Sequence, residues 1–209
     1  MNTLATNIQA SDLPTTYPSV GAENRIFYPV EVESEMGETA AHYLLNSELF
    51  HLLRAFLKSQ TDVVVAANMM VYYDAGNPKN WLAPDIFVCF GTEDKLRRIY
   101  KSWEEGVFPQ VVFEIASDGT FENDLGGKRL NYARLGVEEY YLLDPEREYL
   151  PAPIMAFHRE QGRLVSADVH NDRVLSPLLG LEIVDTGRSF RLFNPEAQEF
   201  LKAVLTGEE

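Results

Sequence analysis

Two acidic residues stand where isolated carboxylates are costly. Glu114 lies inside the apolar run 110–117, and Asp85 follows Pro84 and opens the apolar run 86–90. A carboxylate buried alone would need a metal ion, a cationic partner or a raised pKa. Each residue also fits a structural role. Glu114 could face water at a sheet edge or form an ion pair, and Asp85 could belong to a turn. Together, two carboxylates at the ends of adjacent strands could share one divalent cation such as Mg²⁺.

A cation follows these acids within one helix length. Asp124, Lys128 and Tyr132 are four residues apart in the helical pattern 121–135 and therefore project from one face. Lys128 could reach the same pocket and stabilise charge on a scissile phosphate or polarise an attacking water. An ordinary salt bridge with Asp124 is the structural alternative, and we interpret Tyr132 as core filling. Two carboxylates followed by a cation are the set that metal-assisted phosphodiester cleavage requires.

Nucleophilic catalysis and phosphate-loop binding are less well supported. Ser117 and Thr120 are candidate nucleophiles, but the four histidines form no recognisable triad signature, and a turn or helix-capping role suits both residues. The Gly126-Gly127 pair lacks the spacing of a phosphate-binding loop. Because it falls inside a helical pattern, it predicts close packing or a nearby backbone.

Length and composition favour one globular domain. The 209 residues are 45% hydrophobic and 24% charged, which excludes a disordered or collagen-like chain. Residues 1–25 are rich in Ser, Thr, Asn and Pro, so we expect an N-terminal arm there and a single domain over 26–209. The lone Cys89 argues against a disulfide framework or a cysteine-based zinc site. No leader or membrane-spanning pattern is present, so we expect a cytoplasmic protein with no membrane partner.

The charge argues against one class of nucleic-acid protein. Thirty-two acidic residues against eighteen Lys and Arg give a net charge of −14. Such a chain repels phosphate backbones on average, which excludes a general nucleic-acid coat protein. A nuclease would need basic residues gathered near Asp85. The basic candidates for phosphate contacts, which also fit a solvated helix face, are Lys95, Arg97, Arg98 and Lys101, with Tyr100 and Trp103 between them.

Periodicity places these side chains on a mixed sheet. Helical spacing predicts helices at 39–58, 121–135 and 195–205. Apolar and β-branched runs predict strands at 63–73, 86–90, 110–117, 138–144, 154–159, 163–170 and 181–185. The stretch 95–106 fits a short helix or a loop. The order helix, three strands, helix, strand indicates an α/β (α+β) fold with a mixed central β-sheet flanked by helices, then antiparallel strands and a C-terminal helix.

The combined motifs resemble a known family. The residues that carry the likeness are Pro84-Asp85, the segment 112–117, Thr120, Asp124, Lys128, Tyr132 and the segment 136–145. They resemble the Uma family of putative restriction endonucleases, part of the PD-(D/E)XK nuclease superfamily, closely over about residues 40–145. The resemblance implies a restriction-endonuclease-like core (αβββαβ) and a Mg²⁺-dependent (or Mn²⁺-dependent) DNA endonuclease.

The resemblance also assigns roles to single residues. Asp85 and Glu114 would bind the metal, joined by the backbone carbonyl of Ile115. The superfamily signature places a lysine where this sequence has Ala116. In the resembled family a lysine on the following helix is thought to take that role, and Lys128 is the candidate. Catalysis would then depend on Asp85, Glu114 and Lys128.

The resemblance leaves several points open. Superfamily members often carry a glutamate on the first helix, and both Glu38 and Glu48 fit that position. His42 is near a histidine frequent in the resembled family, or is a capped or partly buried helix residue. A homodimer is plausible because double-strand cutting usually needs two sites. The rival hypotheses are a non-catalytic binding or assembly module, with Glu114 and Lys128 as a structural ion pair, and a hydrolase of small phosphoesters.

Overall fold

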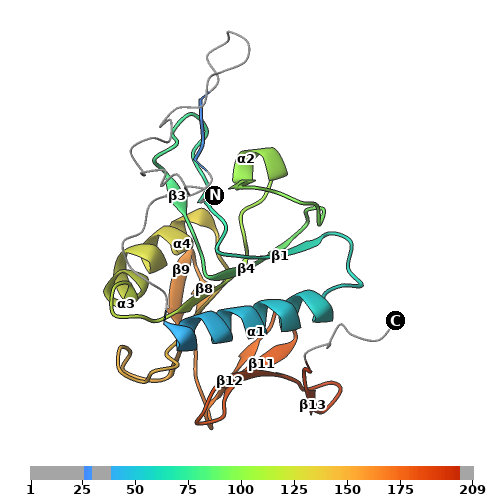
Figure 1. Cartoon of the computed structure of the whole chain (residues 1–209), viewed down its shortest axis with the longest axis vertical. Coiled ribbons are helices and arrows are strands. Elements are labelled where there is room, and N and C mark those ends of the chain that lie inside the picture. Colours follow the sequence, from blue (N-terminus) through green and yellow to red (C-terminus); the bar gives the residue numbers. More distant parts are fainter. Residues whose placement is uncertain (1–25, 30–38, 203–209) are drawn as a thin grey trace, which may run out of the picture.

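A six-stranded mixed sheet forms the centre of the protein (Figure 1). The computed structural model describes residues 26–29 and 39–202, so the expected arm over 1–25 lies outside the described residues. The strand order is β1-β4-β6-β7-β8-β9. Strands β6 and β7 are parallel, and the other neighbouring pairs are antiparallel. The strands are β1 (Val63–Ala67), β4 (Ile86–Phe90), β6 (Val111–Ile115), β7 (Glu139–Leu143), β8 (Ile154–Glu160) and β9 (Arg163–Ser166).

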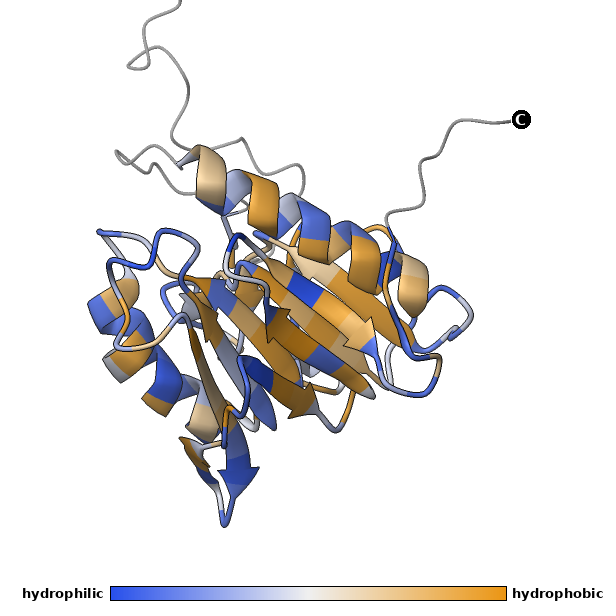
Figure 2. Ribbon diagram, turned by 90° about the horizontal axis from the view of Figure 1, so that it is seen from below, coloured by the Kyte–Doolittle hydropathy of each residue, from blue (hydrophilic) through white to orange (hydrophobic). Residues whose placement is uncertain are grey.

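Helix α1 (Ala40–Phe56) covers one face of this sheet, as predicted. It begins at Thr39, whose side chain accepts a hydrogen bond from the His42 N–H. Its buried residues recur at spacings of three and four and form an apolar stripe, which consists of Leu45, Leu49, Leu52 and Leu53. Figure 2 shows the helix lying across the hydrophobic face of the strands. Burial of this stripe fixes which residues of α1 face the sheet.

A second, four-stranded antiparallel sheet packs against α1 in the same core. It contains β10 (Arg173–Ser176), β11 (Leu181–Asp185), β12 (Phe190–Asn194) and β13 (Glu199–Phe200). The helix predicted at 195–205 is wrong over the described residues. The Asn194 side chain accepts hydrogen bonds from the N–H groups of Glu196 and Ala197, and Gln198 has a φ of 55°. This turn folds the chain back so that β13 pairs with β12.

The helix predicted at 121–135 covers the other face in three segments. These are α3 (Phe121–Asn123), a π-helical turn η2 (Asp124–Lys128) and α4 (Arg129–Leu135). Gly136 ends α4 with a φ of 96°, a conformation that glycine adopts without steric cost. A second apolar core, which includes Val112, lies on this side of the sheet.

The chain departs from the predicted strands at several places: β9 is shorter than the predicted 163–170, and β10, β12 and β13 were not predicted as strands. The run 63–73 is not one strand, because Asn68 has a φ of 51° and separates β1 from β2 (Val71–Tyr72). Strand β2 joins β3 (Trp81–Leu82) and β5 (Tyr100–Lys101) in a small third sheet. The ambiguous stretch 95–106 contains β5 and the short helix α2 (Ser102–Glu105). Within residues 26–29 and 39–202, no helix has the length and apolar character needed to cross a membrane.

Candidate active site

The two predicted acids lie opposite each other on neighbouring strands. Strands β4 and β6 are antiparallel with Ile86 paired to Phe113, so one further step places Asp85 opposite Glu114. Side chains alternate between the two faces of a strand. Phe113 packs in the core beneath α1, so Glu114 faces the side covered by the segmented helix. The sheet register therefore brings together two carboxylates that are 29 residues apart in the sequence.

Asp85 links the ends of two strands and the first helix. Its Oδ2 accepts a hydrogen bond from the Ile115 N–H at 2.6 Å, and His42 Nε2 lies 3.3 Å from the same oxygen. The N–H and C=O of one strand residue point to the same edge, so the Ile115 carbonyl shares the Asp85 side of β6. His42 is thus a site residue, and its contact with Asp85 comes from α1.

Glu114 is held by two residues of the segmented helix. Its side chain is 1% exposed. The Tyr132 hydroxyl donates a hydrogen bond to Oε1 at 2.6 Å, and Lys128 Nζ lies 3.1 Å from Oε2. Lys128 therefore reaches the acids as the sequence predicted, from the helix that follows β6.

Asp124 completes the charged cluster. It is also 1% exposed, and its Oδ1 lies 2.7 Å from Lys128 Nζ. Among the described residues, its two carboxylate oxygens are the buried side-chain atoms that lack a hydrogen bond of good geometry. The ammonium of Lys128 is the cation that balances this acid. One lysine therefore contacts two buried carboxylates.

Burial dominates the electrostatics of the cluster. Burial raises the pKa of Glu114 to about 8, the Lys128 ammonium opposes this shift, and the charges of Asp85 and Asp124 add to it. Burial likewise raises the pKa of Asp124. Burial alone would lower the pKa of Lys128, but Glu114 and Asp124 raise it overall. A further cation would relieve the repulsion among the acids.

The donor set fits a hard divalent ion. Asp85 and Glu114 offer carboxylate oxygens, and Ile115 offers a carbonyl oxygen at the same strand ends. Mg²⁺ is commonly held by one or two carboxylates, with water and substrate phosphate completing its shell. Over the described ranges, no group of three or more His, Cys, Asp or Glu side chains is arranged to hold a metal ion.

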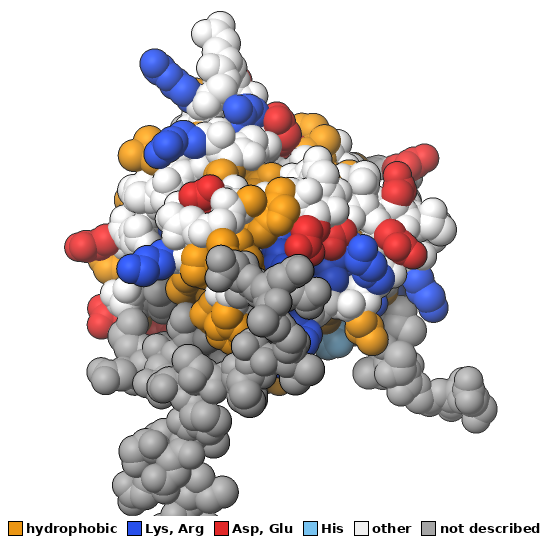
Figure 3. All heavy atoms as spheres, turned by 90° about the horizontal axis from the view of Figure 1, so that it is seen from above, with side chains coloured by type: hydrophobic (Ala, Val, Ile, Leu, Met, Phe, Trp, Pro, Cys, Tyr) orange, Lys and Arg blue, Asp and Glu red, His pale blue; other side chains and the backbone are white. Residues whose placement is uncertain are grey.

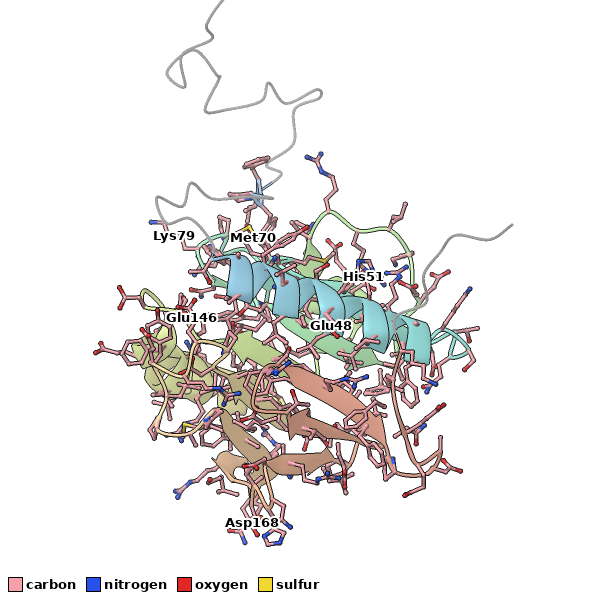
Figure 4. The ribbon with its side chains drawn as sticks, turned by 60° about the horizontal axis from the view of Figure 1, so that its bottom comes forward. Glu48, His51, Met70, Lys79, Glu146 and Asp168 are labelled. Carbon is pink, nitrogen blue, oxygen red and sulfur yellow. The ribbon has the colours of Figure 1, made fainter. Side chains whose placement is uncertain are left out.

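Of the two candidate acids of the first helix, the described one, Glu48, is not part of this cluster. Glu48 lies exposed on α1 (Figure 4). Six residues at about 100° each place it roughly 120° around the helix from His42. Glu38 lies outside the described residues. On α1, His42 is the side chain with a described contact to Asp85.

Three of the four cations of the predicted basic patch are paired with acids of the same segment. Arg97 is 4% exposed on its side chain and donates two hydrogen bonds to Glu105, each 2.8 Å long. Lys95 also pairs with Glu105, and Lys101 pairs with Glu104. Figure 3 shows basic and acidic side chains interspersed over this end of the molecule. Lys95, Arg97 and Lys101 therefore lie beside acids, whereas Arg98 is exposed and has no ion pair within the described part of the chain.

Sequence reasoning missed two members of the cluster. Tyr132 was interpreted as core filling, yet its hydroxyl holds Glu114. Asp124 was treated only as a salt-bridge partner of Lys128. The repeat of four residues that aligns both with Lys128 was the available signal. The Gly126-Gly127 prediction is wrong for Gly126, where an added Cβ would meet no atom within 4 Å, while at Gly127 it would meet Asn123 Oδ1 at 2.6 Å.

The arrangement of sheets and helices is that of a nuclease-like α/β fold. The chain belongs to the Uma2 family, described as a putative restriction endonuclease, whose model matches residues 29–187. Among solved structures it is similar to a putative nuclease of DUF820 from Anabaena variabilis. The two share 17% sequence identity with a TM-score of 0.52, over 71% of this chain and 78% of that one. This likeness shows the fold alone. A comparison with curated proteins finds no match.

Proposed function

We propose that the protein is a Mg²⁺-dependent or Mn²⁺-dependent DNA endonuclease that hydrolyses phosphodiester bonds. The observation that carries this proposal is the convergence of Asp85, Glu114 and Lys128 on one end of β4 and β6. Lys128 pairs with Glu114, and the N–H of the next strand residue, Ile115, donates a hydrogen bond to Asp85. Family membership supports a nucleic-acid substrate. A cytoplasmic location, expected from the sequence, suits that substrate.

Each residue has a distinct part in the proposed reaction. Asp85, Glu114 and the Ile115 carbonyl would hold the divalent ion, which supplies Lewis acidity toward the phosphate and lowers the pKa of an attacking water. Lys128 would place a positive charge beside the phosphate and stabilise the negative charge that develops there. Tyr132 fixes Glu114, and the Ile115 N–H fixes Asp85.

Metal titration combined with DNA cleavage tests this proposal. We expect heat of Mg²⁺ binding in calorimetry, and nicking or cutting of plasmid DNA that requires the metal. Asp85→Asn and Glu114→Gln should each lower the cleavage rate at least 100-fold and weaken metal binding. Asp118→Asn makes the same charge change at an exposed turn residue and serves as the control. Cleavage by Asp85→Asn at the rate of the unmodified protein would overturn the proposal.

One observation favours a non-catalytic alternative. The Lys128–Glu114 ion pair is already formed at 3.1 Å, as expected of a structural pair in a binding or assembly module. Absence of metal binding at millimolar Mg²⁺, together with intact folding, would support this alternative.

Double-strand cutting would add an oligomeric requirement. Two scissile bonds on opposite strands need two active sites, so we propose a homodimer for that activity. Light scattering with and without a short duplex measures the mass directly. If the protein is a monomer and cleaves only one strand of a duplex, the homodimer proposal fails and the activity is nicking.

A further inference from the structure

The proposed chemistry leaves one buried acid without a role. Asp124 is 1% exposed and pairs with Lys128 at 2.7 Å. An exposed ion pair at this spacing contributes little to stability, and a buried one often adds none, because desolvation offsets the attraction. Stability of the helix therefore does not explain an acid at this position.

The backbone around Asp124 holds it firmly in place. Asp124 and Lys128 are the two ends of the π-helical turn η2. The hydroxyl of the buried Tyr140 donates a hydrogen bond to the Asp124 carbonyl oxygen at 3.0 Å. π-helical turns are rare and occur frequently at functional sites. The position of this carboxylate is thus set by the turn and by the core beneath it.

Glu114 would have to serve two cations in the proposed reaction. Its Oε1 accepts from Tyr132 and its Oε2 contacts Lys128. A divalent ion that shares Glu114 would compete with the ammonium of Lys128 and repel it. Asp124 contacts Lys128 and is not one of the proposed metal ligands. Its carboxylate would therefore still attract the lysine after the metal has bound to Glu114.

We propose that Asp124 is a positioning residue that keeps Lys128 in the site when a divalent ion occupies Glu114. Without it, the metal would displace the lysine toward solvent, and the positive charge beside the phosphate would be lost. This inference rests on the proposed function, because it assigns a task to Asp124 in the metal-loaded protein.

Acetylation of lysines, followed by mass spectrometry of peptides, tests the inference without DNA. In the unmodified protein, saturating Mg²⁺ should change the labelling rate of Lys128 by less than about twofold. In Asp124→Asn the rate should rise at least fivefold on addition of Mg²⁺, because the lysine then loses both anionic partners. Asp124→Glu should restore protection, and Asp118→Asn should behave as the unmodified protein. Exposed Lys58 serves as an internal reference.

The outcomes separate the two proposals. If the unmodified protein binds Mg²⁺ but Lys128 of Asp124→Asn stays protected, the inference fails and the proposed function stands. If Asp124→Asn labels rapidly without Mg²⁺, the acid merely maintains local structure and the inference also fails. If the unmodified protein binds no Mg²⁺ and cuts no DNA, the proposed function fails first.

In cleavage assays, Asp124→Asn should lower kcat at least tenfold with a smaller change in KM for DNA.

Discussion

Tyr132 shows how a single hydroxyl makes a buried acid tolerable. Glu114 has no contact with bulk water, so each of its oxygens needs a protein donor. Tyr132 serves one oxygen and Lys128 the other. The tyrosine ring fills the second core while its hydroxyl performs a polar task, which is the combination that aromatic side chains with a polar end allow.

We predict that Tyr132→Phe lowers the free energy of unfolding by about 1–3 kcal/mol, because it removes a hydrogen bond from a buried carboxylate. Urea denaturation measured in EDTA isolates this effect from metal binding. Tyr43→Phe removes a hydroxyl from a residue that is 60% exposed and should leave the midpoint nearly unchanged. If Tyr132→Phe and the unmodified protein are equally stable, the hydrogen bond contributes no net stability.

At the scale of elements, Glu105 ties the segment before β5 to the helix after it. The acid ends α2 and receives Arg97 and Thr92 from the preceding segment. These contacts orient a stretch that has little regular secondary structure. The guanidinium of Arg97 is thereby engaged within the segment, against Glu105.

The Glu105 contacts predict a pH-dependent stability. The hydrogen bonds from Arg97 lower the pKa of Glu105 from 4.5 to about 2, against the opposing effect of burial. A lowered folded-state pKa contributes stability that is present above pH 4.5 and is lost as the pH falls toward 2. Glu105→Gln should therefore cost about 1.5–3 kcal/mol at pH 6.5, and this difference should shrink below pH 4.5 in urea denaturation.

The exposed neighbour Glu104 provides the control for this prediction. It is 59% exposed and pairs with Lys101 on the surface. Glu104→Gln should show a small effect at every pH, since exposed ion pairs contribute little. A stability difference for Glu105→Gln that stays constant from pH 6.5 to pH 3 would contradict the assigned cause.

At the scale of the molecule, α1 connects the C-terminal sheet to the candidate site. The helix packs against the central sheet and against β12, and its first turn carries His42 to Asp85. Figure 1 shows α1 between the central sheet and β11–β12. The C-terminal strands therefore support the helix that contributes to the site.

We predict that Leu192→Ala destabilises the whole protein. Leu192 on β12 is fully buried in the core that includes α1, so the truncation leaves a cavity and should cost about 2–5 kcal/mol. Leu130→Ala removes the same atoms from a side chain that is 64% exposed and should change stability by less than about 0.5 kcal/mol. Thermal and urea denaturation measure both. Equal effects would show that β12 does not share the core.

The net charge predicts a shallow salt dependence of DNA binding. The net charge is −14, and Lys95, Arg97 and Lys101 of the basic patch are paired to acids, so this patch offers few cations that could replace counterions on DNA. The logarithm of the binding constant should fall against the logarithm of salt with a slope smaller than about 3 in magnitude. Fluorescence anisotropy of a labelled duplex, in Ca²⁺ between 50 and 200 mM salt, measures it. A slope near 6 would reveal a basic surface outside this patch.

The sequence by itself determined the elements whose periodicity is strong and local. The apolar spacing of α1, the buried runs of β4, β6 and β7, and the αβββαβ order followed from residue types alone. The site candidates Asp85, Glu114 and Lys128 also stood out, because charged residues beside apolar strands are rare. The wrong helix at 195–205 shows the limit, since an Asx turn at Asn194 and pairing with β12 overrode a helical pattern.

Only the tertiary structure decided which of these residues meet. The antiparallel register of β4 and β6 places Asp85 opposite Glu114, and the helix over that face brings Lys128, Asp124 and Tyr132 to the same carboxylate. No local pattern encodes that register, because it depends on contacts between residues far apart in the chain. The basic patch illustrates the same point, since folding placed Glu105 against cations that the sequence left free. The candidate site is therefore assembled by strand register and helix packing, which residue type alone does not specify.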